Sequence, residues 1–305
     1  MFQNERFFKT GSKVFWILVA FIGFIMLPYI AGLFYNEKKT DDMLQAIIDM
    51  EKILVADTIP DPIKDTSQII NLKKLFWSWT DFSGRRHQLT FSVPKEELNK
   101  ALSFRVNFDN KYPGWDPATI YHEFIKISRI PLDSLAIAMQ KDMQSKNISG
   151  LAAMNYVVTA IQTPPYTKVA IDNECPCNDM GQNWLNDCNA RKDGRGCCNN
   201  VVPFAVFTPT EFIFNRTGDC DTKALIAYAL LRRFNFKCAI IAGIAESGRH
   251  AMLGVSNVRP VIRSSYVNHN GELFYPWEVT DYRPSYLLGN MQMWDSWYDW
   301  EVIYN

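Results

Sequence analysis

The stretch RTGDCDTKALIAYALLRRFNFKCAIIAGI, residues 216–244, decides the fold. From Ala224 to Leu231 it is apolar nearly all the way round a helix, which is typical of a helix buried in a core. Asp219 can cap the start of this helix, and Asn235 follows its end, where Gly or Asn commonly closes a helix. The run from Phe236 then has the composition of a strand. The stretch therefore predicts a central buried helix that leads into a sheet.

Two further strand patterns follow downstream. RHAMLGVS begins at Arg249, and ELFYPWEVT begins at Glu272 directly after an Asn270-Gly271 turn. Short connections between strands favour antiparallel pairing. We expect a fold of the α+β class, in which the buried helix packs on an antiparallel sheet.

The region upstream is expected to contain a hairpin and several helices. Two alternating runs flank Phe82-Ser83-Gly84, a hairpin signal, and a helical stretch opens at Pro94. Residues 118–162 favour helix, apart from Pro131 and a turn at Asn147 to Gly150.

Composition excludes several classes of protein. The chain has 305 residues, of which 48% are hydrophobic and 21% are charged, so it is globular rather than disordered. Lys plus Arg and Asp plus Glu each total 32, which leaves no basic excess for a phosphate backbone. We therefore expect no nucleic-acid partner.

The N-terminus predicts a membrane anchor. No charged residue occurs from Val14 to Asn36. At about 1.5 Å per helical residue, this run is long enough for an apolar bilayer core of about 30 Å. Arg6, Lys9 and Lys13 precede it, so the N-terminus should stay cytoplasmic. We expect a single-pass cell-membrane protein with its main domain periplasmic or extracellular. The alternative is a cleaved signal peptide, for which this apolar run is long.

The predicted organisation has four parts. Residues 1–13 form the cytoplasmic N-terminus, 14–36 the transmembrane anchor and 37–149 an N-terminal extracytoplasmic region. Residues 150–305 form the catalytic domain, with a Cys-rich insertion at 171–202.

Cysteine usage agrees with an oxidising compartment. Of the seven cysteines, Cys175, Cys177, Cys188, Cys197 and Cys198 crowd into the insertion, which lacks the paired spacing and the His ligands of a zinc site. We expect mainly disulfides there, with Cys238 as a further candidate. Calcium or zinc in this segment is the less favoured alternative, and we expect no cofactor. An odd count leaves at least one free thiol, for which Cys220 is the candidate.

Three residues form a candidate catalytic set. Cys220 lies in the first turn of the buried helix, where the helix dipole favours a thiolate. Asp219 and Asp221 oppose this effect, so a basic partner is needed, and His250 on the next strand pattern can supply it. Glu278 at the end of the third strand pattern could orient the imidazole, although Asp281 nearby competes for that role.

These segments resemble a known superfamily. The run at 216–244, then GRHAMLGV at 248–255 and YPWEVTDYRP at 275–284, resemble the core of the transglutaminase-like superfamily, especially its bacterial cysteine-proteinase-like members. The resemblance covers about residues 150–290. It implies a papain-like α+β fold, with Cys220 as nucleophile, His250 as general base and then acid, and an acyl-enzyme intermediate. The family most often has Asp-Pro-Thr where this chain has Glu278-Val279-Thr280. The resemblance also implies a second oxyanion donor from an aromatic side chain upstream, for which Trp184 and Tyr166 are candidates.

The sequence thus favours a membrane-anchored extracytoplasmic cysteine enzyme that acts on amide bonds of proteins or peptides, as protease, transamidase or deamidase. A non-catalytic binding or scaffold domain in an envelope complex is the alternative, since fold alone does not fix function. A third hypothesis makes the Cys-rich segment a metal module that the core only supports.

Overall fold

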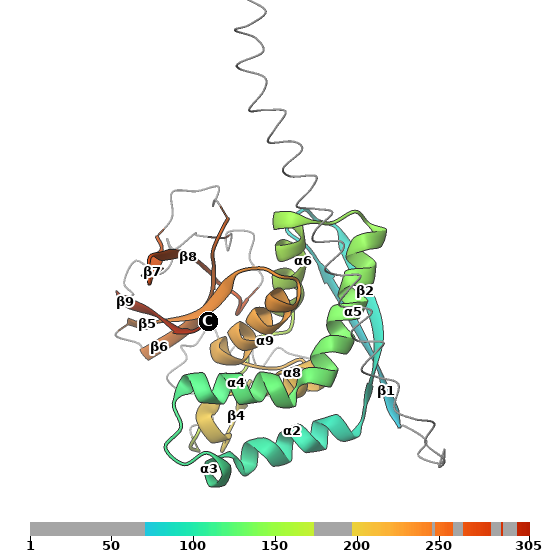
Figure 1. Cartoon of the computed structure of the whole chain (residues 1–305). Coiled ribbons are helices and arrows are strands. Elements are labelled where there is room, and N and C mark those ends of the chain that lie inside the picture. The colour runs from blue at the N-terminus through green and yellow to red at the C-terminus, as the bar shows by residue number, and fades with distance from the viewer. Residues whose placement is uncertain (1–70, 174–196, 246–247, 259–264, 282–287, 289–297) are drawn as a thin grey trace, which may run out of the picture. The chain divides into compact units, whose positions relative to one another are not determined.

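A computed structural model describes residues 71–173, 197–245, 248–258, 265–281, 288 and 298–305 (Figure 1). Residues Ile70 to Asn305 form one compact unit, so the described residues before and after position 150 pack together. The predicted anchor at 14–36 lies outside the described residues. Within the ranges given, no helix has both the length and the apolar character needed to cross a bilayer.

The described elements begin with a hairpin, continue mainly with helices up to Arg233 and end in antiparallel strands. In chain order they are β1 (Leu72–Thr80), β2 (Arg86–Pro94), α2 (Glu96–Val106), α3 (Phe108–Lys111), α4 (Pro117–Ile127), α5 (Arg129–Ser145), α6 (Gly150–Gln162), β3 (Lys168–Val169), β4 (Cys198–Asn199), η1 (Pro203–Ala205), α8 (Pro209–Asn215), α9 (Cys220–Arg233), β5 (Cys238–Ala245), β6 (Gly248–Val255), β7 (Val267–His269), β8 (Glu272–Trp277) and β9 (Tyr298–Tyr304).

The largest sheet has five strands in the order β7-β8-β6-β5-β9, and every neighbouring pair is antiparallel. The strands predicted from Phe236, Arg249 and Glu272 correspond to β5, β6 and β8. Asn270 and Gly271 both have positive φ, 53° and 83°, and form the predicted turn between β7 and β8. The sequence did not predict β9, an edge strand formed by the C-terminal segment.

Helix α9 is the predicted central helix. Every residue from Cys220 to Leu231 is buried except Asp221, because α9 packs on β6 and β5 on one side and on α6 and α8 on the other. Figure 1 shows α9 between the sheet and these helices. Oδ1 of Asp219 accepts the backbone N–H of Thr222 at 3.1 Å, and Asn235 has a φ of 61° just past the helix end. Both helix-end predictions are confirmed.

The N-terminal hairpin and the helices complete the core. β1 and β2 pair in the register Leu72↔Pro94 to Thr80↔Arg86, around the predicted turn. α5 packs on β2, and α6 packs on β1. A buried ion pair joins α2 to α8, with Nη2 of Arg105 2.7 Å from Oε1 of Glu211. The predicted helical region at 118–162 is interrupted at Ser128, between α4 and α5. Pro131 does not interrupt it, because this residue lies in the first turn of α5.

Candidate active site

Cys220 is the first residue of α9, and its side chain is 7% exposed. The approach to the helix is tightly packed, because a Cβ added at Gly218 would lie 2.6 Å from Cγ2 of Thr222. The hydroxyl of Thr222 in turn accepts the backbone N–H of Phe207 at 3.1 Å. The absence of a side chain at Gly218 therefore lets the backbone pass close to Thr222 at the start of α9.

His250 and Glu278 come together from two neighbouring strands. His250 lies in β6, and Glu278 follows directly after β8, which pairs with β6 through Leu253↔Trp277. Nε2 of His250 is 2.7 Å from Oε2 of Glu278. The two side chains are 10% and 2% exposed, so solvent screens this pair little.

The Glu278 carboxylate is held in one orientation. Its Oε1 accepts the backbone N–H of Thr280 at 2.8 Å and the hydroxyl of Thr280 at 2.6 Å. Burial alone would raise the pKa of Glu278, but His250 and the two Thr280 hydrogen bonds outweigh it and hold the pKa below its usual range. Asp281, by contrast, is exposed. Among the alternatives, Glu278 is the carboxylate that contacts His250.

The thiol of Cys220 lies beside the strand that carries His250. The backbone N–H of Ala251, the residue after His250, lowers the pKa of the Cys220 thiol, so it lies close to the sulfur. The S–H group of Cys220 donates to Oδ2 of Asp221 at 3.5 Å. Since Nε2 of His250 faces Glu278, the ring nitrogen suited to take the thiol proton is Nδ1.

The electrostatics of Cys220 differ from the prediction made from its place at a helix start. Burial, and then the neighbouring Asp221 and Asp219 carboxyl groups, raise the pKa of the Cys220 thiol well above its ordinary value, although the Ala251 N–H acts in the other direction. Burial and Asp221 also raise the pKa of Asp219. In this environment the dipole of α9 does not outweigh the lost solvation and the two acidic neighbours.

Of the two aromatic candidates for an oxyanion donor, Tyr166 lies next to the site. Tyr166 forms a parallel bridge with Gly218, and the N–H of Thr167 donates to the carbonyl of Gly218 at 3.0 Å. Burial, then the nearby Cys220 and Asp219, raise the pKa of Tyr166 far above its ordinary value, so its phenol stays an O–H donor. Trp184 lies outside the described residues.

Sequence analysis did not single out Lys223, which is fully buried one turn after Cys220. Its ammonium group donates to the backbone carbonyls of Gln162, Pro164 and Thr280. Lys223 therefore ties the nucleophile helix to Thr280, which holds the Glu278 carboxylate. A lysine within an otherwise apolar helix face is the signal that could have revealed it.

The remaining cysteines are partly described. Cys197 and Cys198 are disulfide-bonded, in agreement with the prediction for these two, whereas Cys220 and Cys238 are free and buried. Cys238 was a candidate for a disulfide, and that expectation is wrong, because its thiol instead donates to the carbonyl of Tyr228 at 3.8 Å. Cys175, Cys177 and Cys188 lie outside the described residues. In the part of the chain that is described, no three His, Cys, Asp or Glu side chains gather as they would around a metal ion.

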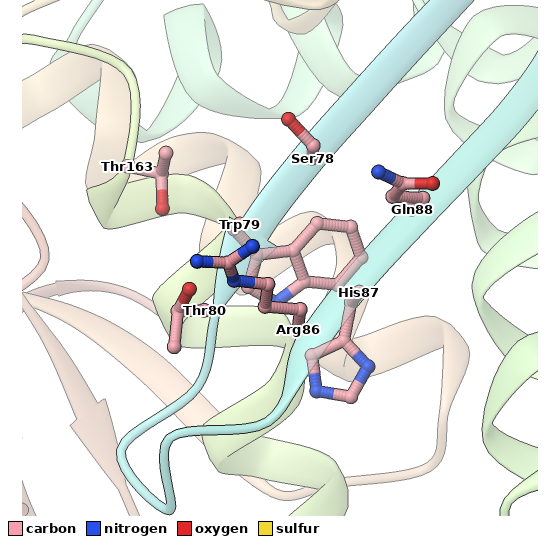
Figure 2. A pocket seen from close by; sticks show the side chains of 7 residues that line it. All are labelled: Ser78, Trp79, Thr80, Arg86, His87, Gln88 and Thr163. Atoms are coloured by element: carbon pink, nitrogen blue, oxygen red, sulfur yellow. The ribbon is translucent and has the colours of Figure 1, made fainter.

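A separate hollow of about 590 Å³ lies on the N-terminal hairpin, away from Cys220. Figure 2 shows its side chains, which come from β1, β2 and Thr163 at the end of α6. His87 lines this hollow, but its ring is 1% exposed and its Nε2 lies 2.9 Å from Oδ2 of Asp81. Its Nδ1 is 3.2 Å from Nζ of Lys146. With both ring nitrogens engaged, His87 has a structural role.

Comparison with known proteins adds no further information about this site. No family model matches the chain, and no curated protein or solved structure matches it significantly.

Proposed function

We propose that this protein is a membrane-anchored extracytoplasmic cysteine enzyme that acts on amide bonds of proteins or peptides through an acyl-enzyme. The observation that carries the proposal is the 2.7 Å contact between buried His250 and Glu278, next to a cysteine at a helix start. A buried imidazole oriented by a buried carboxylate is the usual arrangement of a general base that serves a nucleophile. The anchor at 14–36 and the papain-like fold are parts of the same proposal.

In the first step, Nδ1 of His250 takes the proton of Cys220 as the sulfur attacks the amide carbonyl. Glu278 stabilises the imidazolium that forms, since its carboxylate is already bound to Nε2. Because the pKa of the Cys220 thiol is raised, no stable thiolate forms before the reaction. Proton transfer to His250 and attack of the sulfur on the carbonyl therefore occur together. His250 then returns its proton to the leaving amine, and the acyl group remains on the sulfur.

The oxyanion of the tetrahedral intermediate needs donors near Cys220. The backbone N–H of Cys220 at the start of α9 supplies one. The phenol of Tyr166, whose backbone forms a bridge with Gly218 and whose hydroxyl burial keeps protonated, is our candidate for the second. Water or an amine then attacks the thioester, which gives hydrolysis or acyl transfer respectively.

The scaffold alternative rests on a different observation. Cys220 is 7% exposed, and burial and two neighbouring carboxyl groups raise its pKa, as in an inert buried cysteine. In this case the domain binds envelope proteins without catalysis. The His250–Glu278 pair has no purpose under this alternative beyond stability.

Labelling of the intact ectodomain with iodoacetamide, followed by mass-spectrometric mapping, separates the two functions. An enzyme should be labelled at Cys220, and His250→Ala should slow this labelling strongly. Cys238 serves as an internal control, because it is a free cysteine that is only 1% exposed. If Cys220 resists labelling, or if Cys220→Ala fully complements a deletion strain, the scaffold function replaces the enzyme.

A further inference from the structure

A cavity of about 260 Å³ opens directly beside the candidate catalytic residues. His250 and Ala251 of β6 line it, together with Asp221 from the first turn of α9. One water molecule takes about 30 Å³ in the liquid, so the cavity can admit a whole amino-acid side chain. Its position fits a subsite for a substrate residue next to the bond that Cys220 attacks.

One wall of the cavity is aromatic and aliphatic. Trp115 and Phe204 face each other edge to face, with ring centroids 4.8 Å apart. Trp115 is 40% exposed yet fixed in place, because its Nε1 donates to Oδ1 of Asp109 at 2.5 Å. Further apolar lining comes from Pro117, Ile120 and Val206, from Ile303 of β9 and from residues of β5 such as Ile244. This wall suits the hydrocarbon part of a side chain.

The backbone that supplies Phe204 is strained. Phe204 has a φ of 66° and the following Ala205 a φ of 52°, in the left-handed region that side chains other than glycine seldom adopt. Strain of this kind costs stability and is concentrated at ligand-binding positions. The strained turn places the Phe204 ring in the cavity wall against Trp115, which supports a binding role for this wall.

Another part of the cavity lining is acidic. Asp299 and Glu301 of β9 both line it and are both exposed. Among the residues that the structure describes, neither carboxylate forms an ion pair. Arg249 also belongs to the lining, whereas Asp221 adds a third carboxyl group. Acidic groups therefore outnumber basic ones around the cavity.

An irregularity in β9 produces this acidic part of the lining. Ala242 pairs with Glu301 but Ile244 pairs with Tyr298, so β9 carries one residue more than β5 over this span. Asp299 within this bulge has a φ of 51°. Bulges beside active sites commonly redirect side chains. The adjacent Trp300 lies against Gly243, where an added Cβ would come within 2.6 Å of its ring.

We propose that this cavity binds a lysine or arginine side chain of the substrate, on the side of the scissile bond that faces β9. The aliphatic stem would pack against Trp115 and Phe204, and the positive group would reach Asp299 and Glu301. Long basic side chains commonly bury their stems while the charged end stays near water, as the exposed carboxylates here require. This assignment rests on the proposed function, since it makes the cavity a subsite of the same reaction.

Short peptides that carry an iodoacetamide group in place of the scissile amide can test the assignment. Cys220 displaces iodide from the reagent, and the rate constant of this labelling is measured with Lys, Met or Glu at the adjacent position. Each rate is divided by that of plain iodoacetamide on the same protein, so differences in thiol reactivity cancel. We expect the Lys reagent to react roughly tenfold faster than the Met reagent, and the Glu reagent to be slowest.

Removing the two carboxylates should remove the preference. In the double variant Asp299→Asn/Glu301→Gln, the normalised Lys and Met rates should become equal. The control variant Glu96→Gln/Asp172→Asn removes two exposed carboxylates that do not line the cavity, and it should keep the preference. Equal Lys and Met rates on the unmodified protein, or a Lys preference that survives the double variant, would overturn the assignment and leave a purely apolar subsite.

The measurements distinguish a wrong proposal for the enzyme from a wrong proposal for the subsite. If no reagent labels Cys220, the enzyme is refuted, and the cavity is then tested by calorimetry with unreactive Lys and Met peptides on Cys220→Ala protein. Tighter binding of the Lys peptide that is lost in the Asp299→Asn/Glu301→Gln background would support the basic preference. Equal binding of the two peptides would refute it.

Discussion

Nε2 of His250 lies 2.7 Å from Oε2 of Glu278, while both hydrogen bonds from Thr280 occupy the other oxygen of the same carboxylate. The carboxylate therefore cannot rotate away from the imidazole without losing bonds to its own strand end. A base whose ring is fixed in this way keeps one tautomer, with the proton on Nε2 and Nδ1 left to accept. The contact makes the proposed catalytic role of His250 depend on Glu278.

Glu278→Gln should lower kcat by on the order of 10³-fold while leaving a trace of activity. The amide can still reach His250, but it cannot stabilise the imidazolium as a carboxylate does. Cys220→Ala and His250→Ala should each abolish turnover without weakening substrate binding. Steady-state kinetics on a peptide substrate provide the measurement, with Asp281→Asn as the matched control. Full activity in Glu278→Ala beside inactive Asp281→Ala would transfer the orienting role to Asp281.

Local sequence signals were sufficient for the centre of the fold. The unbroken apolar surface of Ala224 to Leu231 predicted α9, and turn residues such as Asn270 and Gly271 predicted where strands meet. The three candidate site residues could be chosen because residues at a helix start, near the start of one strand and just after another strand can meet in a fold of this class. The structure brings His250 and Glu278 into contact and sets Cys220 against the residue after His250.

Features that depend on distant burial could not be predicted. The sequence of β9, YDWEVIY, contains strand-forming residues, but its place beside β5 depends on the folded chain. Lys223 was missed because its acceptors come from Gln162, Pro164 and Thr280, which only the folded chain brings together. The upward shift in the pKa of Cys220 was missed for the same reason, since the sequence reveals the helix dipole but not how deeply the thiol is buried.

Lys223→Met should lower the free energy of unfolding by about 1 to 3 kcal/mol. The methionine fills similar space, but the backbone carbonyls of Gln162, Pro164 and Thr280 lose a buried donor. Urea unfolding of the ectodomain measures this, and Lys141→Met on the exposed face of α5 is the control, expected within about 0.5 kcal/mol of the unmodified protein. A Lys223→Met protein as stable as the control would show that the hydrogen bonds of Lys223 to these three carbonyls do not stabilise the fold.

Asp81 should make the fold sensitive to acid. Despite its burial, hydrogen bonds from Ser83 and His87 and the charge of Arg85 hold the pKa of Asp81 well below its usual range. Asp142, beside Lys146 and Tyr156 on the other side of His87, also has a lowered pKa. A lowered folded-state pKa means that the unfolded chain binds the proton first. The stabilisation is therefore complete above the ordinary carboxyl pKa, near 3.8, and is lost as pH falls below it.

Asp81→Asn tests this directly. The variant should be less stable than the unmodified protein at neutral pH, and the difference should shrink as the pH falls below about 4. Thermal unfolding followed across this pH range gives the comparison, with exposed Glu96→Gln as a control that should parallel the unmodified protein. A constant difference at all pH values would mean that Asp81 contributes through packing alone.

The resting thiol of Cys220 should be protonated at neutral pH, because burial and the Asp221 and Asp219 carboxyl groups raise its pKa. Labelling by iodoacetamide should then keep rising through the alkaline range, since the thiolate is the reactive form. Asp221→Asn removes the nearest acidic neighbour but keeps an oxygen for the Tyr121 hydroxyl, which donates to Oδ1 at 2.7 Å. The variant should label several-fold faster at neutral pH, with its profile shifted to lower pH, whereas exposed Asp172→Asn should leave the profile unchanged. A rate that is already level below neutral pH in the unmodified protein would instead reveal a thiolate formed at rest, in which His250 is charged before substrate arrives.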